Sequence, residues 1–326
     1  MVNNFFHRNE LAFFSGVKEL QAKVFRGALF ILILFLSCSS ESQYISKSGI
    51  PFIHINKGQL YKMPDDTKKE EVIKIDISYA ISKFEITNEE FVSVLTQDKF
   101  YIGVGGRTFC YKPWGIVVVP LTNSDRIFQT GIKEEGDWIA VIPGKESYPV
   151  HGVTFAGALA FSNELSLKDG LTPVYVYRDE NIEINPDADG YRIPKEIEWE
   201  YAAYADSKNI YPWGNKITNE YVNSSEREES LYAPTTPVGF FDGKNNISTK
   251  NNSSPFGVYD MIGNVAEWCW GKNEIISIYD SIYGRNILRG GSYMKRLASL
   301  NRSANREEVG GFPHWAGIRI VKYLYE

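Results

Sequence analysis

Cysteine and histidine are scarce in this sequence. Its 326 residues include three cysteines and four histidines, and His54, His151 and His314 stand isolated from one another. Nothing therefore supports a three-histidine iron site, and we expect no iron. His151, which precedes a predicted helix, is interpreted as a structural residue. Cys110 and Cys269 could pair in an oxidising compartment, and two buried free thiols are the alternative.

A hydrophobic run long enough to span a bilayer is also lacking. The apolar stretch from Gly27 to Ser37 has eleven residues, whereas a spanning helix needs about twenty. Basic residues precede this stretch and Cys38 follows it, which is typical of a bacterial lipoprotein signal. We predict a signal peptide at 1–37, lipidation at Cys38 and a flexible, serine-rich tether at 38–50. A plain signal peptide and an uncleaved amphipathic anchor are the alternatives.

An excess of positive charge is absent as well. Four basic and two acidic residues lie in 1–37, so the remaining 289 residues carry 31 Lys and Arg against 38 Asp and Glu, a formal charge of −7. Nucleic-acid binding depends on clustered Lys and Arg, so we expect no nucleic-acid partner. With 20 Tyr, 19 Phe and 7 Trp in the whole chain, residues 51–326 have the bulk for one core.

Local patterns predict a mixture of helices and strands. Residues 71–77 alternate apolar and charged side chains, as a half-buried strand does. Thr87 and Glu90 form a capping-box pattern, and Thr154 can cap a second helix. Pro194 is expected in the first turn of a third helix. The segment from Gly103 to Gly144 predicts loops and short strands.

The segment from Gly257 to Trp270 combines turn residues with two carboxylates. Its Gly-Asn pair predicts a tight turn, and the residues after the turn alternate as in a strand. Asp260 and Glu267 lie seven residues apart around this turn. Carboxylate and carbonyl oxygens are the ligands that calcium prefers, so the segment could hold a calcium ion. An ordinary acidic loop is the alternative.

Seven short motifs follow one another along the chain. They are FEITNEEF at 84–91, YPVHGV at 148–153, YRIPKEIEWEYAA at 191–203, YPWG at 211–214, GVYDMIGNVAEWCW at 257–270, LRGGSY at 288–293 and GIR at 317–319. In this order they resemble the motifs of the formylglycine-generating enzyme, or sulfatase-modifying factor, family. The resemblance spans residues 51–326 and implies a single α+β domain with the C-type lectin-like fold of the formylglycine-generating enzyme type and little regular secondary structure.

The resemblance also implies which site residues are present and which are missing. A structural calcium site of the family matches Asp260, the carbonyls of Gly263 and Val265, and Glu267. The enzymes of the family bind copper through two thiols after the Gly-Gly-Ser motif. Here Lys295 stands at the nearest such position, and no cysteine follows Cys269. We therefore expect no copper and no enzymatic activity of that type.

The C-terminal layout is similar to that of the variable proteins that diversity-generating retroelements target, such as the one from Treponema. Gly-Gly-Ser-Tyr is followed by 23 residues, 294–316, and then by Gly-Ile-Arg. This segment mixes charged, polar and aromatic residues without a period, as binding loops do. The residues predicted to form the contact face are Met294, Lys295, Arg296, Leu297, Asn301, Arg302, Glu307, Phe312, His314 and Trp315.

These features predict an exported protein, lipid-anchored to a bacterial membrane at the cell surface. It would bind a protein or glycan ligand through segment 294–316, which a retroelement would diversify, and would not act as an enzyme. One alternative is an oxidoreductase that uses Cys110, Cys269 and His151. Another is a structural lipoprotein of the envelope, in which 294–316 is an ordinary terminal loop.

Overall fold

The computed structural model of the chain describes residues 43–62, 71–103, 108–120, 130–226, 235–244, 249–271, 273, 275–300, 302 and 306–324. The predicted signal peptide, Cys38 and Asn301 lie outside these ranges. Residues Gln43–Glu326 form one compact unit. Within the described part of the chain, no helix has both the length and the apolar character needed to cross a membrane.

The two ends of this unit meet in one antiparallel sheet. Its order is β1 (Gln43–Ile45), β2 (Pro51–Ile55), β5 (Tyr79–Ser82) and β18 (Val321–Tyr323). The prediction of a flexible tether is therefore wrong for residues 43–50. Tyr44 pairs with Phe52 and stacks on its ring at 5.2 Å, and Lys47 donates to the carbonyl of Asp169 at 2.8 Å. The tether prediction rested on the serine content of the segment, and composition alone does not indicate contacts with residues distant in the sequence.

A second four-stranded sheet carries the GNVAEW motif. Its order is β16 (Arg306–Val309), β15 (Asn286–Arg289), β13 (Ala266–Cys269) and β17 (Ala316–Gly317). Strands β13 and β17 run parallel, and the other pairs are antiparallel. Glu267 is opposite Arg289 on one side and Gly317 on the other. Three of the seven motifs thus meet on adjacent strands.

Smaller sheets surround these two. They are β3 (Gly58–Lys62) with β4 (Glu71–Ile75); β6 (Phe100–Ile102) with β7 (Thr108–Tyr111) and β8 (Ile116–Pro120); β9 (Ile132–Glu135) with β10 (Trp138–Val141); and β11 (Tyr175–Arg178) with β12 (Asn181–Ile184) and β14 (Ile275–Ser277). The predicted strand at 71–77 is confirmed as β4, which ends at Ile75.

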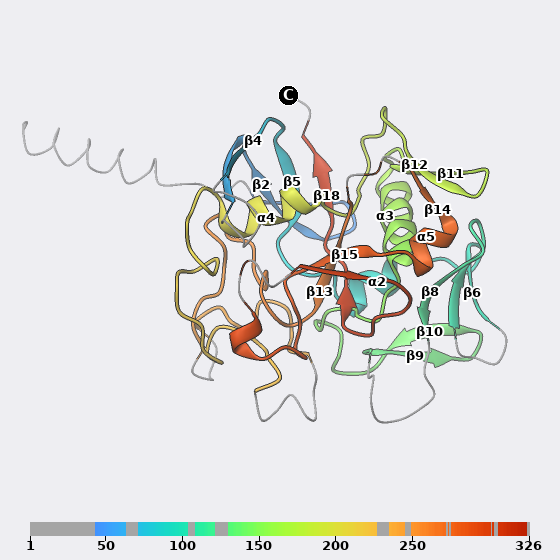
Figure 1. Ribbon diagram of the computed structural model, residues 1–326. Helices are drawn as coiled ribbons and strands as arrows, with labels where there is room; N and C mark the ends of the chain where they lie inside the picture. Colours follow the sequence, from blue (N-terminus) through green and yellow to red (C-terminus); the bar gives the residue numbers. More distant parts are fainter. Residues whose placement is uncertain are drawn as a thin grey trace, which may run out of the picture. The chain divides into compact units, whose positions relative to one another are not determined.

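The α-helices in the described ranges are α2 (Asn88–Val94), α3 (Phe155–Asp169), α4 (Glu196–Tyr204) and α5 (Ile278–Tyr283). The capping box of Thr87 and Glu90 is confirmed, with both hydrogen bonds present, and Thr154 caps α3. Pro194 is not in the first turn of α4, because Lys195 is the N-cap. Figure 1 shows α4 and α3 on opposite sides of strands β13 and β15.

The core consists of two hydrophobic clusters divided by β13. Ala266, Trp268 and Trp270 belong to the cluster around α3, whereas Cys269 belongs to the cluster around α4. Successive strand residues point to opposite faces, and all four residues of β13 are buried, so this strand lies between the two layers of the core. Cys269 and Cys110 are both buried and free. Of the two predicted states of these cysteines, the structure therefore shows two buried free thiols and not a disulfide.

Candidate functional site

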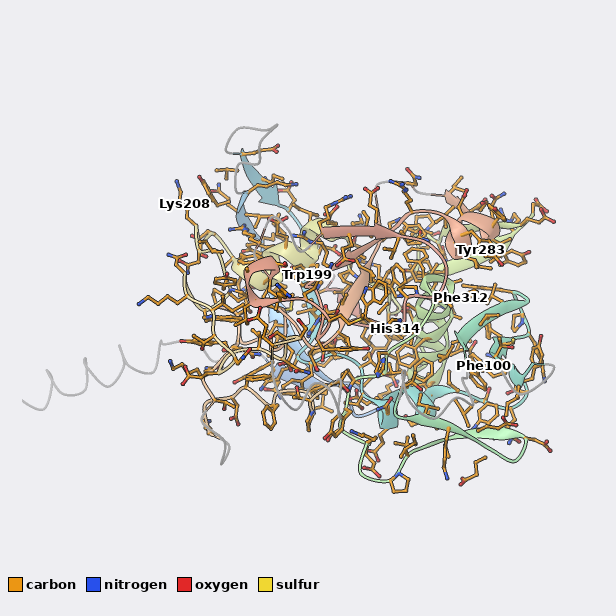
Figure 2. The ribbon with its side chains drawn as sticks, turned by 60° about the horizontal axis from the view of Figure 1, so that its bottom comes forward. Phe100, Trp199, Lys208, Tyr283, Phe312 and His314 are labelled. Atoms are coloured by element: carbon orange, nitrogen blue, oxygen red, sulfur yellow. The ribbon has the colours of Figure 1, made fainter. Side chains whose placement is uncertain are left out.

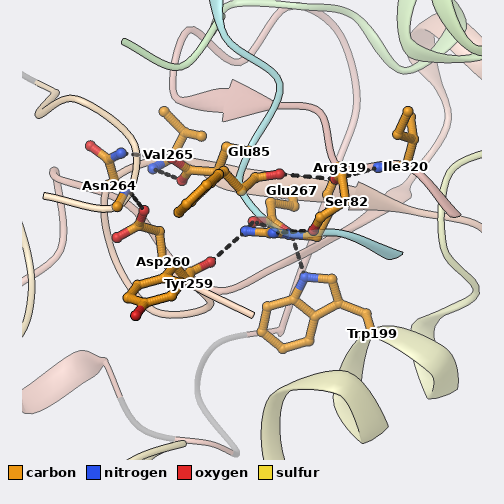
Figure 3. Close-up of polar contacts among 12 residues, drawn as sticks. Ser82, Glu85, Trp199, Tyr259, Asp260, Asn264, Val265, Glu267, Arg319 and Ile320 are labelled. Carbon is orange, nitrogen blue, oxygen red and sulfur yellow. Dashed lines mark hydrogen bonds and ion pairs between the residues drawn. The ribbon is translucent and has the colours of Figure 1, made fainter. Parts of the chain in front are cut away.

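An ion pair at the centre of the fold joins the GNVAEW and GIR motifs. The Arg319 guanidinium contacts both carboxylate oxygens of Glu267, with Nε at 2.9 and 2.8 Å and Nη2 at 2.7 Å from Oε1. Neither side chain is more than 1% exposed. Trp199 Nε1 of α4 also donates to Glu267 (Figure 3). This carboxylate therefore links β13, α4 and the C-terminal segment.

Arg319 also fixes the end of β5 and the loop that contains Asp260 through their backbone carbonyls. It donates to the carbonyl of Ser82 at 2.8 Å and to that of Tyr259 at 2.8 Å. Burial lowers the pKa of Arg319, but the attraction of Glu267, the hydrogen bonds to it and the nearby charges of Glu85 and Asp260 together raise this pKa above its usual value. A bidentate, charge-assisted contact of this kind has a fixed geometry, so Arg319 sets the position of the Asp260 loop.

Asp260 is held in this loop by donors from two other segments. Its carboxylate accepts from the backbone N–H of Gly239 at 2.5 Å and from Asn252 Nδ2 at 2.9 Å. Asp260 itself has a φ of 58°, which an aspartate tolerates better than most residues. At Gly263, with φ 82°, a Cβ would lie 2.6 Å from the carbonyl of Asn223, so the turn requires glycine.

Glu85 is a third buried carboxylate in the group and was not identified from the sequence. It accepts from the backbone N–H of Val265 at 3.1 Å and from Asn264 Nδ2 at 2.7 Å (Figure 3). Burial, followed by repulsion from Asp260 and Glu267, raises its pKa well above the usual range. Burial also raises the pKa of Asp260. Three carboxylates thus share one nearby guanidinium.

The oxygen atoms of this group are of the type that calcium prefers, but they already have partners. Asp260 accepts two hydrogen bonds, and Glu267 is bound by Arg319 and Trp199. A carboxylate oxygen can accept more than one contact, so hydrogen bonding does not prevent a metal. The positive charge of Arg319 would repel a calcium ion at this position, whereas the three nearby carboxylates would attract the ion. Calcium at Asp260, Gly263, Val265 and Glu267 therefore stays a prediction.

The predicted contact residues at the start of 294–316 lie at the surface. Met294 is 47% exposed, Arg296 is exposed, and Leu297 begins a short 3-10 helix. The Lys295 ammonium lies 2.9 Å from Glu307, which ties this turn to β16. The carbonyl of Lys295 also accepts from the N–H of Ser225. Met294 and Arg296 are therefore exposed side chains on an anchored backbone, whereas Leu297 is half-buried against the cluster around α4.

Arg302 is a correction to the predicted contact face, because its side chain is only 3% exposed. It donates to Glu200 at 3.3 Å, to the carbonyl of Ser207 at 2.9 Å and to the carbonyl of Tyr61. Its guanidinium also lies 4.2 Å from the ring centre of Tyr204. The ion pair with the buried carboxylate of Glu200 stabilises Arg302 inside the core. The residues next to Arg302 in the sequence are mixed in character and gave no indication of this burial.

The last predicted contact residues differ in exposure. Phe312 is 44% exposed, while His314 and Trp315 are half-buried with their rings edge to face at 4.9 Å. His151 Nδ1 lies 2.7 Å from the carbonyl of His314, so this histidine has a structural contact, as expected. Burial, followed by the proximity of His151, lowers the pKa of His314.

The residues of the predicted oxidoreductase alternative have separate neighbours. Cys110 contacts Thr108, Cys269 contacts the carbonyl of Glu267, and His151 contacts His314. Burial raises the pKa of the Cys269 thiol well above its usual range. Among the residues that the structure describes, no three or more His, Cys, Asp or Glu side chains form a group suited to a metal ion.

Known proteins resemble this chain in sequence and in fold. The chain is 27% identical over 209 residues to the chaperone protein LppX of Paenibacillus barcinonensis, covering 54% of this chain and 70% of that protein. It is 30% identical over 113 residues to inactive C-alpha-formylglycine-generating enzyme 2 of Bos taurus, covering 32% of this chain but only 33% of that protein.

The structure of Treponema denticola variable protein 1 superimposes with a TM-score of 0.55 at 19% identity, covering 88% of this chain and all of that one. This likeness shows the fold, which is the predicted α+β, C-type lectin-like fold of the formylglycine-generating enzyme type. Residues 43–324 match the sulfatase-modifying factor enzyme 1-like domain. The chain therefore belongs to the sulfatase-modifying factor, or formylglycine-generating enzyme, family.

Proposed function

We propose that this protein is a non-catalytic lipoprotein, displayed on the bacterial cell surface, that binds a protein or glycan ligand through segment 294–316. The observation that carries the proposal is the contrast within this segment. Met294 and Phe312 are 47% and 44% exposed, whereas Leu300 and Arg302 are buried. Buried anchors that fix the backbone while other side chains face solvent are what a binding loop requires.

The state of the thiols supports a role other than the family's copper chemistry. No cysteine follows Cys269, so the position after the Gly-Gly-Ser motif offers Lys295 in place of a thiol. Cys269 is fully buried, and its raised pKa keeps it protonated at neutral pH. A protonated, fully buried thiol is a poor nucleophile.

The diversification part of the proposal is tested by sequencing the 3′ end of the gene in sister strains and subcultures. We expect substitutions at the exposed positions Met294, Arg296 and Phe312. Codons for the buried Leu300 and Arg302 should stay fixed, because changes there would unfold the protein. A substitution profile that is flat across 294–316 and the rest of the chain would remove the retroelement hypothesis.

Calcium and the lipid anchor are further parts of the proposal. A calcium ion held by Asp260, Glu267 and the carbonyls of Gly263 and Val265 would offset the excess of buried carboxylates. Lipidation at Cys38 would place the domain on the membrane. Replacement of Cys38 by Ala should move the protein from the membrane fraction to the soluble fraction, and continued membrane association would contradict lipidation at this residue.

A second candidate is a chaperone-like role with one fixed protein partner, which the similarity to LppX favours. Such a protein would show no variation at Met294 or Arg296 among related copies. It would also stabilise one exported protein during refolding. A structural lipoprotein of the envelope would also show no variation but would not assist refolding, so sequencing followed by refolding assays separates these roles.

A further inference from the structure

The described domain begins close in sequence to Cys38, the residue proposed to carry the lipid. Strand β1 starts at Gln43, five residues after Cys38, and is paired with β2. A fully extended chain of five residues spans about 18 Å at most. A lipid on Cys38 therefore keeps the start of β1 within that distance of the lipid-bearing residue at the bilayer surface.

Residues 43–50 are bonded to the core of the domain. The carboxylate of Asp169, at the end of α3, accepts a hydrogen bond from Ser48 Oγ and another from the Tyr191 hydroxyl at 2.8 Å. The Lys47 ammonium donates to the carbonyl of Asp169 at 2.8 Å. Because these bonds join the segment to α3, it does not act as a swivel between the lipid and the domain. The surface around β1 is therefore the part of the domain that the lipid holds nearest to the bilayer.

An exposed aliphatic side chain and a lysine lie beside the start of β1. Gln43 and Ile45 share one face of the strand, because side chains alternate between faces, and Ile45 is 66% exposed. The Lys83 ammonium donates to Oε1 of Gln43 at 3.1 Å. It also lies 5.6 and 5.7 Å from the ring centres of Phe84 and Tyr259, which are both half-buried. We call Ile45, Lys83, Phe84 and Tyr259 the N-terminal corner.

Lys83 has a fixed position in this corner. The N–H of Tyr259 donates to the carbonyl of Lys83 at 2.9 Å, and the rings of Phe84 and Tyr259 are 5.5 Å apart. Within the described residues, Lys83 takes part in no ion pair, and its ammonium contacts an amide oxygen and two rings. Its charge is therefore not neutralised by a carboxylate at contact distance. Lysines with their stems along apolar groups and their ammonium in water are typical of membrane interfaces, where they attract anionic headgroups.

We infer that the N-terminal corner rests on the membrane that carries the Cys38 lipid, with Ile45 in the headgroup region and Lys83 on anionic phospholipid headgroups. The inference rests on the proposed lipid anchor and names the partner of this surface. The short connection to Cys38 selects this partner, because a surface joined to a bilayer by so few residues meets lipid at a high effective concentration. Aromatic rings beside a lysine are also the composition of interfacial belts. Segment 294–316 then keeps one orientation to the membrane.

The test uses the lipidated protein as purified from the bacterial membrane, transferred to vesicles of phosphatidylcholine and phosphatidylglycerol. One fluorophore is attached at Ile45→Cys or, as a control, at Tyr283→Cys; the two cysteines of the described domain are buried. Tyr283 is 57% exposed, lies near Phe312 in Figure 2, and belongs to α5, which Figure 1 shows well apart from β2. We expect a quencher on the lipid headgroups to lower the fluorescence of the label at position 45 and to leave that at position 283 unchanged.

A charge reversal tests the part played by Lys83. Lys83→Glu should lower the quenching of the label at position 45, because phosphatidylglycerol repels the new carboxylate. Lys145→Glu is the matched control, since Lys145 is also half-buried and its ammonium lies 3.7 Å from the ring centre of Tyr148. This control should leave the quenching unchanged. Equal melting temperatures of the two variants show that a difference between them arises at the surface.

The outcomes separate this inference from the proposed lipid anchor. No quenching at position 45, or equal quenching at positions 45 and 283, overturns the membrane contact while the anchor stands. A label at position 45 that is shielded from a water-soluble quencher, yet not quenched by lipid, shows a protein neighbour such as a second copy and also overturns the contact. Membrane association that persists after Cys38→Ala contradicts the anchor itself.

Discussion

Arg319 and Glu267 form a bidentate ion pair that is buried on both sides and joins residues 52 positions apart in the chain. Because Arg319 also holds the carbonyls of Ser82 and Tyr259, the pair organises the loops around the GNVAEW strand. The charges are paired in a low-dielectric interior, so removing one of them leaves the other without compensation.

Replacement of Glu267 by Gln should therefore destabilise the protein strongly. We expect a loss of about 3–5 kcal/mol in the free energy of unfolding, because the Arg319 charge stays buried. Urea unfolding measures this change. Glu308→Gln is the control, since it breaks an exposed pair with Arg306 and should change stability by about 0.5 kcal/mol or less. Equal losses of stability in the two variants would show that the buried pair contributes no more to stability than the exposed pair does.

Calcium should raise the melting temperature if it binds at Asp260 and Glu267. An ion at about 100 times its dissociation constant adds about 2.7 kcal/mol to the stability of the folded state. Melting in EDTA and in excess calcium measures the difference, with magnesium as the control ion. Identical melting curves in EDTA and in calcium would contradict calcium binding at this site. Arg319 would then supply the positive charge that balances these carboxylates.

The stability of the protein in EDTA should depend on pH through Glu85. Burial and nearby carboxylates raise the pKa values of Glu85 and Asp260 in the folded state. The folded protein therefore holds more protons than the unfolded chain above the ordinary carboxyl pKa of about 4, and stability falls as pH rises from there toward the raised pKa values.

Glu85→Gln removes one of these titrations, so the decline of stability with pH should become shallower. The variant also replaces one hydrogen-bond acceptor for Asn264 and should be about 1–3 kcal/mol less stable at low pH. Urea unfolding between the carboxyl range and neutral pH measures both effects. A slope equal to that of the parent would mean that Glu85 stays ionised in the folded protein.

Arg302 and Arg296 should differ sharply although both lie in segment 294–316. Arg302→Ala removes hydrogen bonds to Glu200 and to the carbonyls of Ser207 and Tyr61, and we expect it to cost about 3–5 kcal/mol. Arg296 is exposed, so Arg296→Ala should change stability by no more than about 0.5 kcal/mol. Thermal melting of both variants tests this; similar melting temperatures would contradict the buried position of Arg302.

The local elements were predictable because their causes lie within a few residues. The capping box of Thr87 and Glu90 and the cap of α3 by Thr154 are contacts between near neighbours in sequence. The position of α4 was less well predicted. Its N-cap is Lys195, with the Glu198 side chain bound to the Lys195 backbone, so the helix begins after Pro194.

By itself, the sequence determined the family and fold, the absence of a thiol pair after the Gly-Gly-Ser motif, and the starts of α2 and α3, because each depends on residues in a fixed local order. Only the tertiary structure decided which polar residues face inward. It shows that Arg319 pairs with Glu267, that Glu85 lies with Asp260 and Glu267 in one buried group of carboxylates, and that Arg302 is buried beside Glu200. These choices depend on oppositely charged or hydrogen-bonding partners from distant segments, and a buried charge is stable only where such a partner meets it.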